Sequence, residues 1–329
     1  TPTLEKRILG KSGILVTRIG LGLWAIGGYA AGGNTWGATD DRESLDTIDA
    51  ALDAGVNLFD TADRYGMGHS EELLGQAMRG RRDRFVVATK IGWKDFDGER
   101  NRSAYDTVDK LIAGVESGLH RLGTGYLDLI LSHIDFRDPT MEVFLEGFQK
   151  LQREGKVRAY GVSTSDFEYL QAFNADDGCA VLEIDYSLLN RTPEAKVFPY
   201  CVEHKIGVIV RGPLAMGILT GKFGPDSQFG ADDWRQRWQK DPDEHRIYLQ
   251  DLATVDKLRP LATDRTLAQL ALQFVTTHPA VTTTIPGAKT PQQLKDNVGA
   301  ALFPPLTPEE LDALDAITPP GGGRKVWPA

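Results

Sequence analysis

The stretch RFVVATK at residues 84–90, with TVDKLIAGVESGLHRLG at 107–123 and YLDLILSH at 126–133, decides the fold. The two outer runs are short and apolar, as buried strands are. The middle segment repeats apolar residues at helical spacing and ends at Gly123, a residue that commonly stops helices. A strand, a helix and a strand in this order pair in parallel through a right-handed crossover. The segment therefore predicts an α/β fold with a parallel sheet.

The same alternation extends in both directions along the chain. Strands are predicted at 19–24, 56–60, 84–90, 126–133, 157–163, 181–186, 207–211 and 281–286. Helices are predicted at 43–54, 70–78, 107–122, 142–153, 167–173, 193–204, 267–277 and 291–301. Eight such units fit a closed (β/α)8 TIM barrel better than an open sheet.

We expect residues 1–329 to form a single barrel domain with three additions. These are an N-terminal β-hairpin, an extra helix within the insert at 221–263 after the seventh strand, and a C-terminal helix at 307–317. The tail that begins at Pro319, with the sequence PPGGGRKVWPA, is predicted to be flexible.

The composition excludes several classes of protein. Among 329 residues, 37 are Lys or Arg and 46 are Asp or Glu, which gives a net charge of −9. Nucleic-acid binding needs a basic face, so we expect no nucleic-acid partner. No run of 18 apolar residues occurs and no signal-peptide pattern precedes Gly13, so a cytoplasmic protein without a membrane span is expected. The two cysteines have no metal-ligand spacing, and no bound metal is expected.

Polar residues end three successive predicted strands. Asp60 ends the second strand, Lys90 the third and His133 the fourth, while Tyr65 follows Asp60 in the next loop. Catalytic groups of (β/α)8 barrels sit at the C-terminal ends of the strands. Any one of these residues alone is better explained by a structural role, but four at one rim indicate a catalytic site.

The four side chains suit the reduction of a carbonyl group. Hydride transfer leaves negative charge on the carbonyl oxygen, and Tyr65 could donate a proton to it. A neighbouring Lys90 cation would lower the pKa of the phenol, and Asp60 would keep Lys90 charged and oriented. His133 would hold the carbonyl oxygen by a hydrogen bond. The hydride must come from a cofactor, since no side chain supplies one.

These residues lie in motifs that resemble the aldo-keto reductase family. The motifs are GVNLFDTADRYG at 55–66, GHSEELLG at 68–75, ATK at 88–90 and LDLILSH at 127–133, and the resemblance extends from Arg7 to Leu314. The C-terminal pattern is most similar to the branch with potassium-channel β-subunits and bacterial sugar-aldehyde reductases. The resemblance implies an NADP(H)-dependent reductase of aldehydes or ketones, with Asp60, Tyr65, Lys90 and His133 as its catalytic tetrad.

The resemblance also implies that NADP(H) lies extended across the barrel mouth. The residues implied to bind it are Trp24, Asp60, Ser163, Thr164, Glu183, Arg211, Gly212, Pro213, Leu214, Gly217, Lys222, Gly287, Lys289, Gln293 and Asn297. Lys222 is the expected phosphate contact, and Lys289 is the expected contact of the 2′-phosphate.

Four of these positions depart from the family pattern. Thr164 stands where asparagine is usual, Glu183 where glutamine is usual, and Arg211 where an aromatic residue often stacks on the nicotinamide. Gln293 occupies a position that holds arginine in strongly NADP-selective members. The changes at Thr164 and Glu183 leave the fine orientation of the nicotinamide open, but not its presence. The Arg211 guanidinium can still stack on the ring, although it adds positive charge there. The change at Gln293 leaves NAD(H) possible as the cofactor.

The substrate pocket is less clearly marked. Aromatic candidates near the strand ends are Trp24, Tyr29 and Trp93, and Trp234 and Trp238 of the insert could fold over the mouth. The charged loop at 94–102 suggests polar substrates such as sugar aldehydes. Neither the physiological substrate nor the oligomeric state follows from the sequence.

Three other interpretations compete with the reductase. A cofactor-sensing regulatory subunit is compatible with the channel-subunit resemblance, although His133 is a residue at which such subunits depart from the tetrad. A metal-assisted lyase or hydrolase would use Asp60, His133 and Asp135, but further converging ligands are missing. The run GLGLWA at 20–25 matches a Rossmann fingerprint, yet helical pattern resumes only near Glu43, which argues against that fold.

Overall fold

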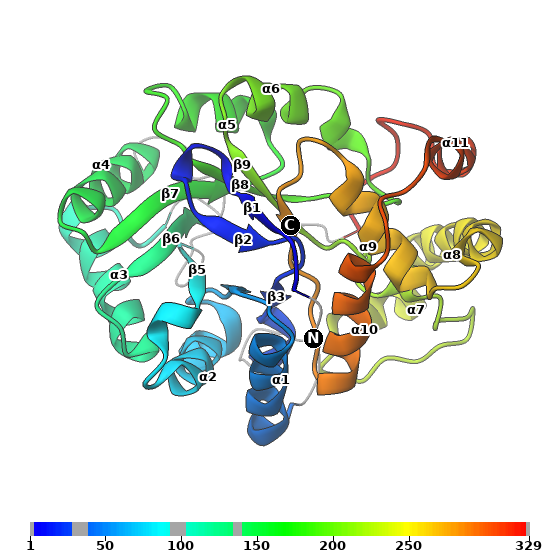
Figure 1. Cartoon of the computed structure of the whole chain (residues 1–329), viewed down its shortest axis with the longest axis horizontal. Coiled ribbons are helices and arrows are strands. Elements are labelled where there is room, and N and C mark those ends of the chain that lie inside the picture. Colours follow the sequence, from blue (N-terminus) through cyan, green and yellow to red (C-terminus); the bar gives the residue numbers. More distant parts are fainter. Residues whose placement is uncertain (1–2, 28–38, 93–102, 134–139, 327–329) are drawn as a thin grey trace.

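The computed structural model describes residues 3–27, 39–92, 103–133 and 140–326, and within them helices enclose a ring of parallel strands (Figure 1). The ring consists of β3 (Leu21–Gly22), β4 (Leu58–Asp60), β5 (Val86–Ile91), β6 (Leu127–Ser132), β7 (Val157–Ser163), β8 (Val181–Asp185), β9 (Gly207–Arg211) and β10 (Thr283–Thr284). Each strand pairs in parallel with the next. The ring closes where the Gly20 N–H donates to the Thr284 carbonyl at 2.8 Å and Gly22 bridges to Gly287. The predicted barrel is confirmed.

The helices occupy the predicted places between the strands. Those around the ring are α1 (Asp41–Asp53), α2 (His69–Met78), α3 (Val108–Leu122), α4 (Thr140–Arg153), α5 (Phe167–Phe173), α6 (Val197–Glu203), α9 (Leu267–Thr277) and α10 (Pro291–Gly299). The insert after β9 adds α7 (Arg237–Lys240) and α8 (Pro242–Ala262), and α11 (Pro308–Ile317) follows the barrel. No helix among the described residues is long and apolar enough to span a bilayer.

Local chemistry explains where the helices begin. The Asp40 carboxylate accepts the Glu43 N–H before α1, and the Thr107 hydroxyl accepts the Lys110 N–H before α3. These contacts satisfy backbone donors that a helix leaves unpaired in its first turn. Gly123 ends α3 with a φ of 63°, a conformation that glycine adopts without a Cβ penalty.

Two predictions about the C-terminal half are wrong. The helix expected over 193–204 is split into a 3-10 turn at Thr192–Glu194 and the shorter α6, because Pro199 lacks the N–H that a continuous helix would need there. Tyr186 and Arg191 both bind the Glu194 carboxylate of the turn. The tail expected to be flexible is packed over 319–326. Arg324 pairs with Asp251 of α8 at 2.8 Å, and the Arg191 N–H donates to Gly322 at 2.7 Å.

The strand alternation divides the barrel interior into two layers. Successive residues of a strand point to opposite faces, so residues two apart share one face. Toward the N-terminal end, the inward layer is apolar and includes Leu58, Ala88, Leu131, Val181 and Ile209. The residues two positions later along the same strands are Asp60, Lys90, His133, Glu183 and Arg211. A packed apolar base therefore carries a polar layer at the C-terminal rim.

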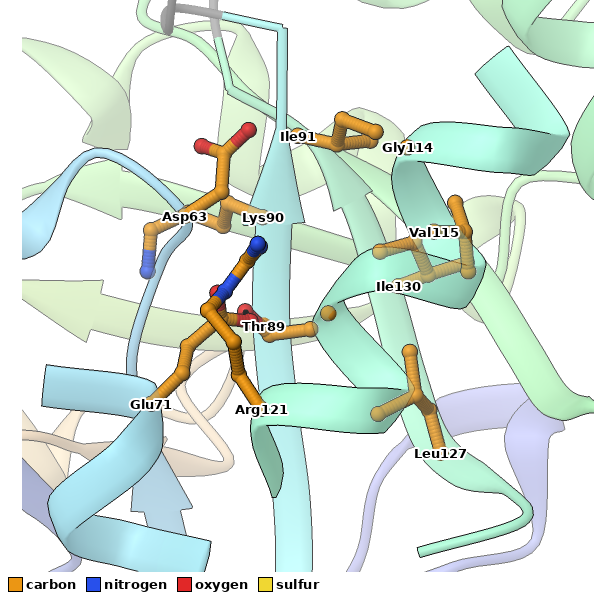
Figure 2. A pocket seen from close by; sticks show the side chains of 11 residues that line it. Asp63, Glu71, Thr89, Lys90, Ile91, Gly114, Val115, Arg121, Leu127 and Ile130 are labelled. Carbon is orange, nitrogen blue, oxygen red and sulfur yellow. Dashed lines mark hydrogen bonds and ion pairs between the residues drawn. The ribbon is translucent and has the colours of Figure 1, made fainter. Parts of the chain in front are cut away.

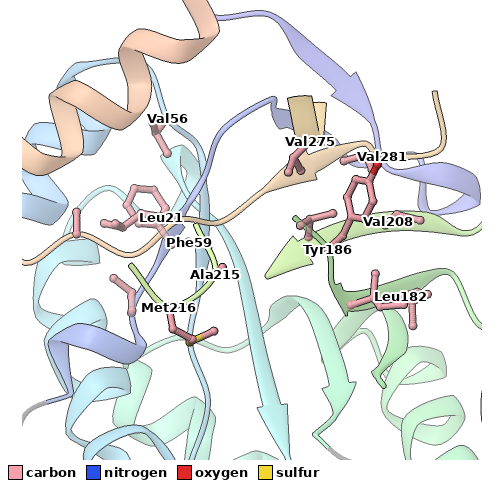
Figure 3. Packing of buried hydrophobic residues seen from close by; sticks show 14 of the residues in the cluster. Leu21, Val56, Phe59, Leu182, Tyr186, Val208, Ala215, Met216, Val275 and Val281 are labelled. Atoms are coloured by element: carbon pink, nitrogen blue, oxygen red, sulfur yellow. The ribbon is translucent and has the colours of Figure 1, made fainter. Parts of the chain in front are cut away.

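The N-terminal hairpin closes the opposite end of the barrel. It consists of β1 (Lys6–Ile8) and β2 (Leu15–Thr17), which pair antiparallel and cross the ring in Figure 1. Leu9, Ile14 and Val16 are buried in the same apolar cluster as the inward side chains of the barrel. A second, outer core fills the space between strands and helices, and Figure 3 shows two parts of it, Phe59 beside Leu21 and Val208 beside Tyr186. The predicted hairpin is confirmed.

Candidate active site

Lys90 occupies the centre of the polar layer. Its ammonium donates to Asp60 at 2.5 Å and to the Thr61 carbonyl at 2.9 Å, and it lies 3.3 Å from the Glu183 carboxylate. Lys90, Asp60 and Glu183 each expose only 1% of their surface. A charge this well buried needs close partners, and here one ammonium is shared by two carboxylates. The pairing of Lys90 with Asp60 was predicted, whereas the contact with Glu183 was not.

A strained loop brings Tyr65 over this ion cluster. Gly66 has a φ of 59°, Met67 of 55° and Gly68 of 100°, so the chain turns through the left-handed region three times in succession. A Cβ on Gly66 would lie 2.0 Å from the Gly27 carbonyl oxygen, which leaves room only for glycine there. The loop therefore depends on close contact between two backbones.

The Tyr65 ring has three neighbours that matter for chemistry. The Lys90 ammonium lies 5.1 Å from the ring centroid, the His133 ring 5.8 Å away at 84°, and the Trp24 ring 6.3 Å away at 25°. Asp60, Tyr65, Lys90 and His133 thus lie together at one rim, and Trp24 borders the same space.

Burial governs the electrostatics of these groups. It raises the pKa of the Tyr65 phenol above its ordinary range, while the Lys90 charge acts in the opposite direction. Lys90 does lower the pKa of the phenol, as expected. This effect is smaller than that of burial, because desolvation penalises the phenolate more strongly. Burial opposes the charge of Lys90 too, yet Asp60 and Glu183 overcome it and raise the pKa of the ammonium.

His133 and Asp60 are driven toward their neutral forms. Burial lowers the pKa of His133 well below its usual value, and the positive charges of Lys90 and Arg211 add to that effect. Burial, followed by the nearby Glu183, raises the pKa of Asp60, while Lys90 lowers it. Around neutral pH His133 is therefore an uncharged imidazole, which keeps one N–H donor and one acceptor.

A buried polar relay anchors the helix that follows the Tyr65 loop. The Glu71 carboxylate accepts from Arg121 at 2.8 Å and from the Thr89 hydroxyl at 2.9 Å, which ties α2 to α3 and β5. Figure 2 shows these side chains beside β5, around a cavity of about 10 Å³ that is close to the smallest able to hold a water. The motif containing Glu71 was recognised from sequence, but this anchoring role was not.

The expected nicotinamide residues present a set of unsatisfied polar atoms. Among the described residues, the Ser163 hydroxyl, one Glu183 oxygen and the Arg211 Nε are buried without a hydrogen-bond partner. Ser163 and Glu183 are register partners on β7 and β8. A hydroxyl donor beside a carboxylate acceptor matches an amide group, so the residues present fit a nicotinamide carboxamide. Thr164 instead accepts the Asp166 N–H at 3.0 Å, next to the start of α5.

The loop after β9 has the strained backbone of a binding loop. Gly212, Ala215, Met216 and Gly217 have φ values of 61°, 51°, 58° and 94°. Left-handed conformations at non-glycine residues persist only where the surroundings hold them, and they cluster at ligand sites. Pro213 is buried and Leu214 half-buried in this loop, whereas the Lys222 side chain is exposed.

The expected adenosine end lies at the start of α10. The Lys289 N–H donates to the Gln293 side chain at 2.8 Å, and Asn297 donates to the Gly287 carbonyl at 3.2 Å. Burial lowers the pKa of Lys289, and a nearby Arg235 lowers it further. Arg235 comes from the insert and donates to the Met216 carbonyl at 3.3 Å. It contacts the loop after β9, lies near Lys289 and pairs with Asp233 at 2.7 Å. It was missed because nothing in its local sequence distinguishes it.

Of the other aromatic residues expected near the substrate, two lie outside the described residues and two are buried in the insert. Tyr29 and Trp93, with the loop at 94–102 and Asp135, lie outside the described residues. Trp234 and Trp238 are buried rather than turned over the mouth. Their rings lie 5.5 Å apart, and Trp238 stacks on Tyr248 of α8 at 5.4 Å, so the insert has an aromatic core of its own. Within the described residues, no group of three His, Cys, Asp or Glu side chains could hold a metal.

Comparison with known proteins places the chain in a large set of relatives. The model described as "Aldo/keto reductase family" matches residues 18–319. An aldo-keto reductase of Bacillus subtilis is 36% identical over 89% of this chain and 87% of its own length. The NADH-specific methylglyoxal reductase of Escherichia coli is 31% identical over 90% of this chain and 93% of its own length. A probable voltage-gated potassium channel β-subunit of Oryza sativa is 28% identical over 95% of this chain and 96% of its own length.

Solved structures agree with this assignment. The glycerol dehydrogenase of Gluconobacter oxydans superimposes with a TM-score of 0.80 at 32% identity, covering 99% of this chain and 98% of that one. An aldo/keto reductase of Klebsiella pneumoniae, solved with NADP and acetate, superimposes with a TM-score of 0.72 at 28% identity, covering 98% and 99%.

Proposed function

Because the chain belongs to the aldo/keto reductase family of oxidoreductases, we propose that it reduces aldehydes or ketones to alcohols with NADP(H). The observation that carries the proposal is the meeting of the Tyr65 phenol, the Lys90 ammonium and the His133 imidazole at one rim. Polar substrates such as sugar aldehydes are the favoured class. The glycerol dehydrogenase and methylglyoxal reductase among the relatives support small oxygenated substrates.

Each tetrad residue has a distinct part in the proposed reaction. NADPH, when bound, supplies the hydride. Tyr65 keeps its proton at neutral pH and gives it to the carbonyl oxygen as negative charge forms there. Lys90 stabilises the resulting phenolate, and Asp60 fixes Lys90 through the 2.5 Å contact. Neutral His133 donates a hydrogen bond that positions the carbonyl oxygen.

The test is turnover of 4-nitrobenzaldehyde with NADPH, followed by the loss of absorbance of the reduced cofactor. Tyr65→Phe should lower kcat by about 10²- to 10⁴-fold, the usual contribution of a general acid, and should still bind the cofactor. Tyr126→Phe is the control, since Tyr126 precedes β6 at the other end of the barrel. Equal turnover in Tyr65→Phe and wild type would refute the assignment.

The choice of NADP(H) over NAD(H) rests on the positive charge at the start of α10. Lys289 and the nearby Arg235 suit a 2′-phosphate, and the Klebsiella structure with NADP supports the same choice. Lys289→Ala should weaken NADPH binding about tenfold and leave NADH binding unchanged, while Lys295→Ala, an exposed lysine of the same helix, should change neither. A wild-type protein that binds both cofactors equally would exclude NADP selectivity.

A cofactor-sensing regulatory subunit is the second candidate, supported by the similarity to the Oryza channel subunit. His133 favours catalysis, since such subunits depart from the tetrad at this position. A stoichiometric membrane-protein partner, together with turnover that Tyr65→Phe leaves unchanged, would favour regulation.

A further inference from the structure

Glu183 places a second carboxylate against the catalytic ammonium. One of its oxygens lies 3.3 Å from the Lys90 nitrogen, which already has Asp60 as a partner at 2.5 Å. The pKa of Lys90 is raised, so the residue stays cationic, while burial and the nearby Glu183 raise the pKa of Asp60 toward its protonated form. Glu183 therefore adds to the centre of the site an acidic group, 3.3 Å from the ammonium, that the usual glutamine at this position would not supply.

The second oxygen of Glu183 has no partner among the described residues. This oxygen and the Ser163 hydroxyl are both buried without a hydrogen-bond partner, and the two residues are paired in register. The Glu183 carboxylate also interacts with Asp60, whose second oxygen is likewise unpaired. Arg211, the nearest cation on the following strand, is in register with Asp185, a buried carboxylate whose pKa it lowers against the effect of burial. Arg211 thus faces a carboxylate of its own, and Glu183 lies in register with Ser163 at the subsite that fits the carboxamide.

We propose that Glu183 makes the nicotinamide subsite favour the oxidised, cationic cofactor over the reduced, neutral one. The inference rests on the proposed function, because it takes that subsite as given. The nicotinamide ring gains positive charge when it loses hydride, and a fixed carboxylate beside it stabilises that charge in a poorly solvated site. Glu183 thereby favours carbonyl reduction and makes the oxidised product the tighter ligand.

The experiment compares dissociation constants for NADP⁺ and NADPH, measured at pH 8 by fluorescence titration or calorimetry. Wild type should bind NADP⁺ more tightly than NADPH. Glu183→Gln should lower this preference by about tenfold, since a full charge next to a cation in a partly dry site is worth at least that much. Glu183→Asp, which keeps the charge, should retain most of the preference.

Ser163→Ala is the matched control from the same subsite. It removes a hydrogen bond without changing charge, so it should weaken both cofactor forms equally and leave their ratio unchanged. A ratio in Glu183→Gln within twofold of wild type would overturn the inference. If Glu183→Gln fails to fold, the wild-type measurement decides by itself. Tighter binding of NADPH than of NADP⁺ by wild type would overturn the inference. Failure of wild type to bind either form would instead refute the proposed function.

Discussion

The close contact between Gly66 and Gly27 makes a sharp test of how Tyr65 is positioned. In Gly66→Ala the new Cβ would lie 2.0 Å from the Gly27 carbonyl oxygen, with φ at 59°. The left-handed conformation costs an alanine about 1 kcal/mol, and relieving a clash with backbone costs about 1–3 kcal/mol more. We therefore expect a loss of about 2–4 kcal/mol in the free energy of unfolding.

The activity of the same variant should fall further than its stability suggests. Relief of the clash must shift the loop that carries Tyr65, and a misplacement of about 1 Å costs about 10²-fold in rate. Gly80→Ala is the control, because Gly80 has a φ of 74° but nothing within 4 Å of a Cβ. It should lose about 1 kcal/mol of stability and keep its kcat. Thermal melts and NADPH consumption measure both quantities, and equal behaviour of the two variants would refute the reasoning.

Two further predictions concern the aromatic insert and the buried histidine. Trp238→Ala should destabilise the protein by about 3–5 kcal/mol in urea unfolding, because the side chain packs against Trp234 and Tyr248. Val202→Ala, at a residue 61% exposed, should change stability by less than about 0.5 kcal/mol, and similar values for both would contradict the packing argument. The folded-state pKa of His133 is depressed, so below about pH 6.5 the unfolded chain takes up a proton that the folded chain refuses. Wild type should lose stability relative to His133→Gln as pH falls from about 7 to 5, and parallel stability curves would show that His133 is not buried in its neutral form.

Much of the fold could be predicted because its signals are local. The runs at 157–163 and 207–211 and the helices at 167–173 and 267–277 have the predicted bounds, since apolar periodicity and capping residues act within a few positions. The split at Thr192–Glu194 has a local signal in Pro199, but the contacts of Tyr186 and Arg191 with the Glu194 carboxylate in the turn have none. The ordered tail depends on Asp251, which is distant in sequence from Arg324.

The candidate site shows the same division. That Asp60, Lys90 and His133 meet follows from their places at the ends of adjacent strands, a regular property of the barrel. The contact between Glu183 and Lys90 crosses the barrel interior, and the approach of Arg235 to Lys289 depends on how the insert folds. Neither has a local signature. A single domain and a cytoplasmic location stay predictions.

The hairpin of β1 and β2 has a consequence for the order of events during turnover. Its side chains fill one mouth of the barrel, so the dinucleotide and the carbonyl compound of the proposed reaction would share the opposite opening. The ligand that reaches deepest has to enter before the other and depart after it. For the proposed reaction, steady-state kinetics should therefore show a compulsory sequence of binding and release.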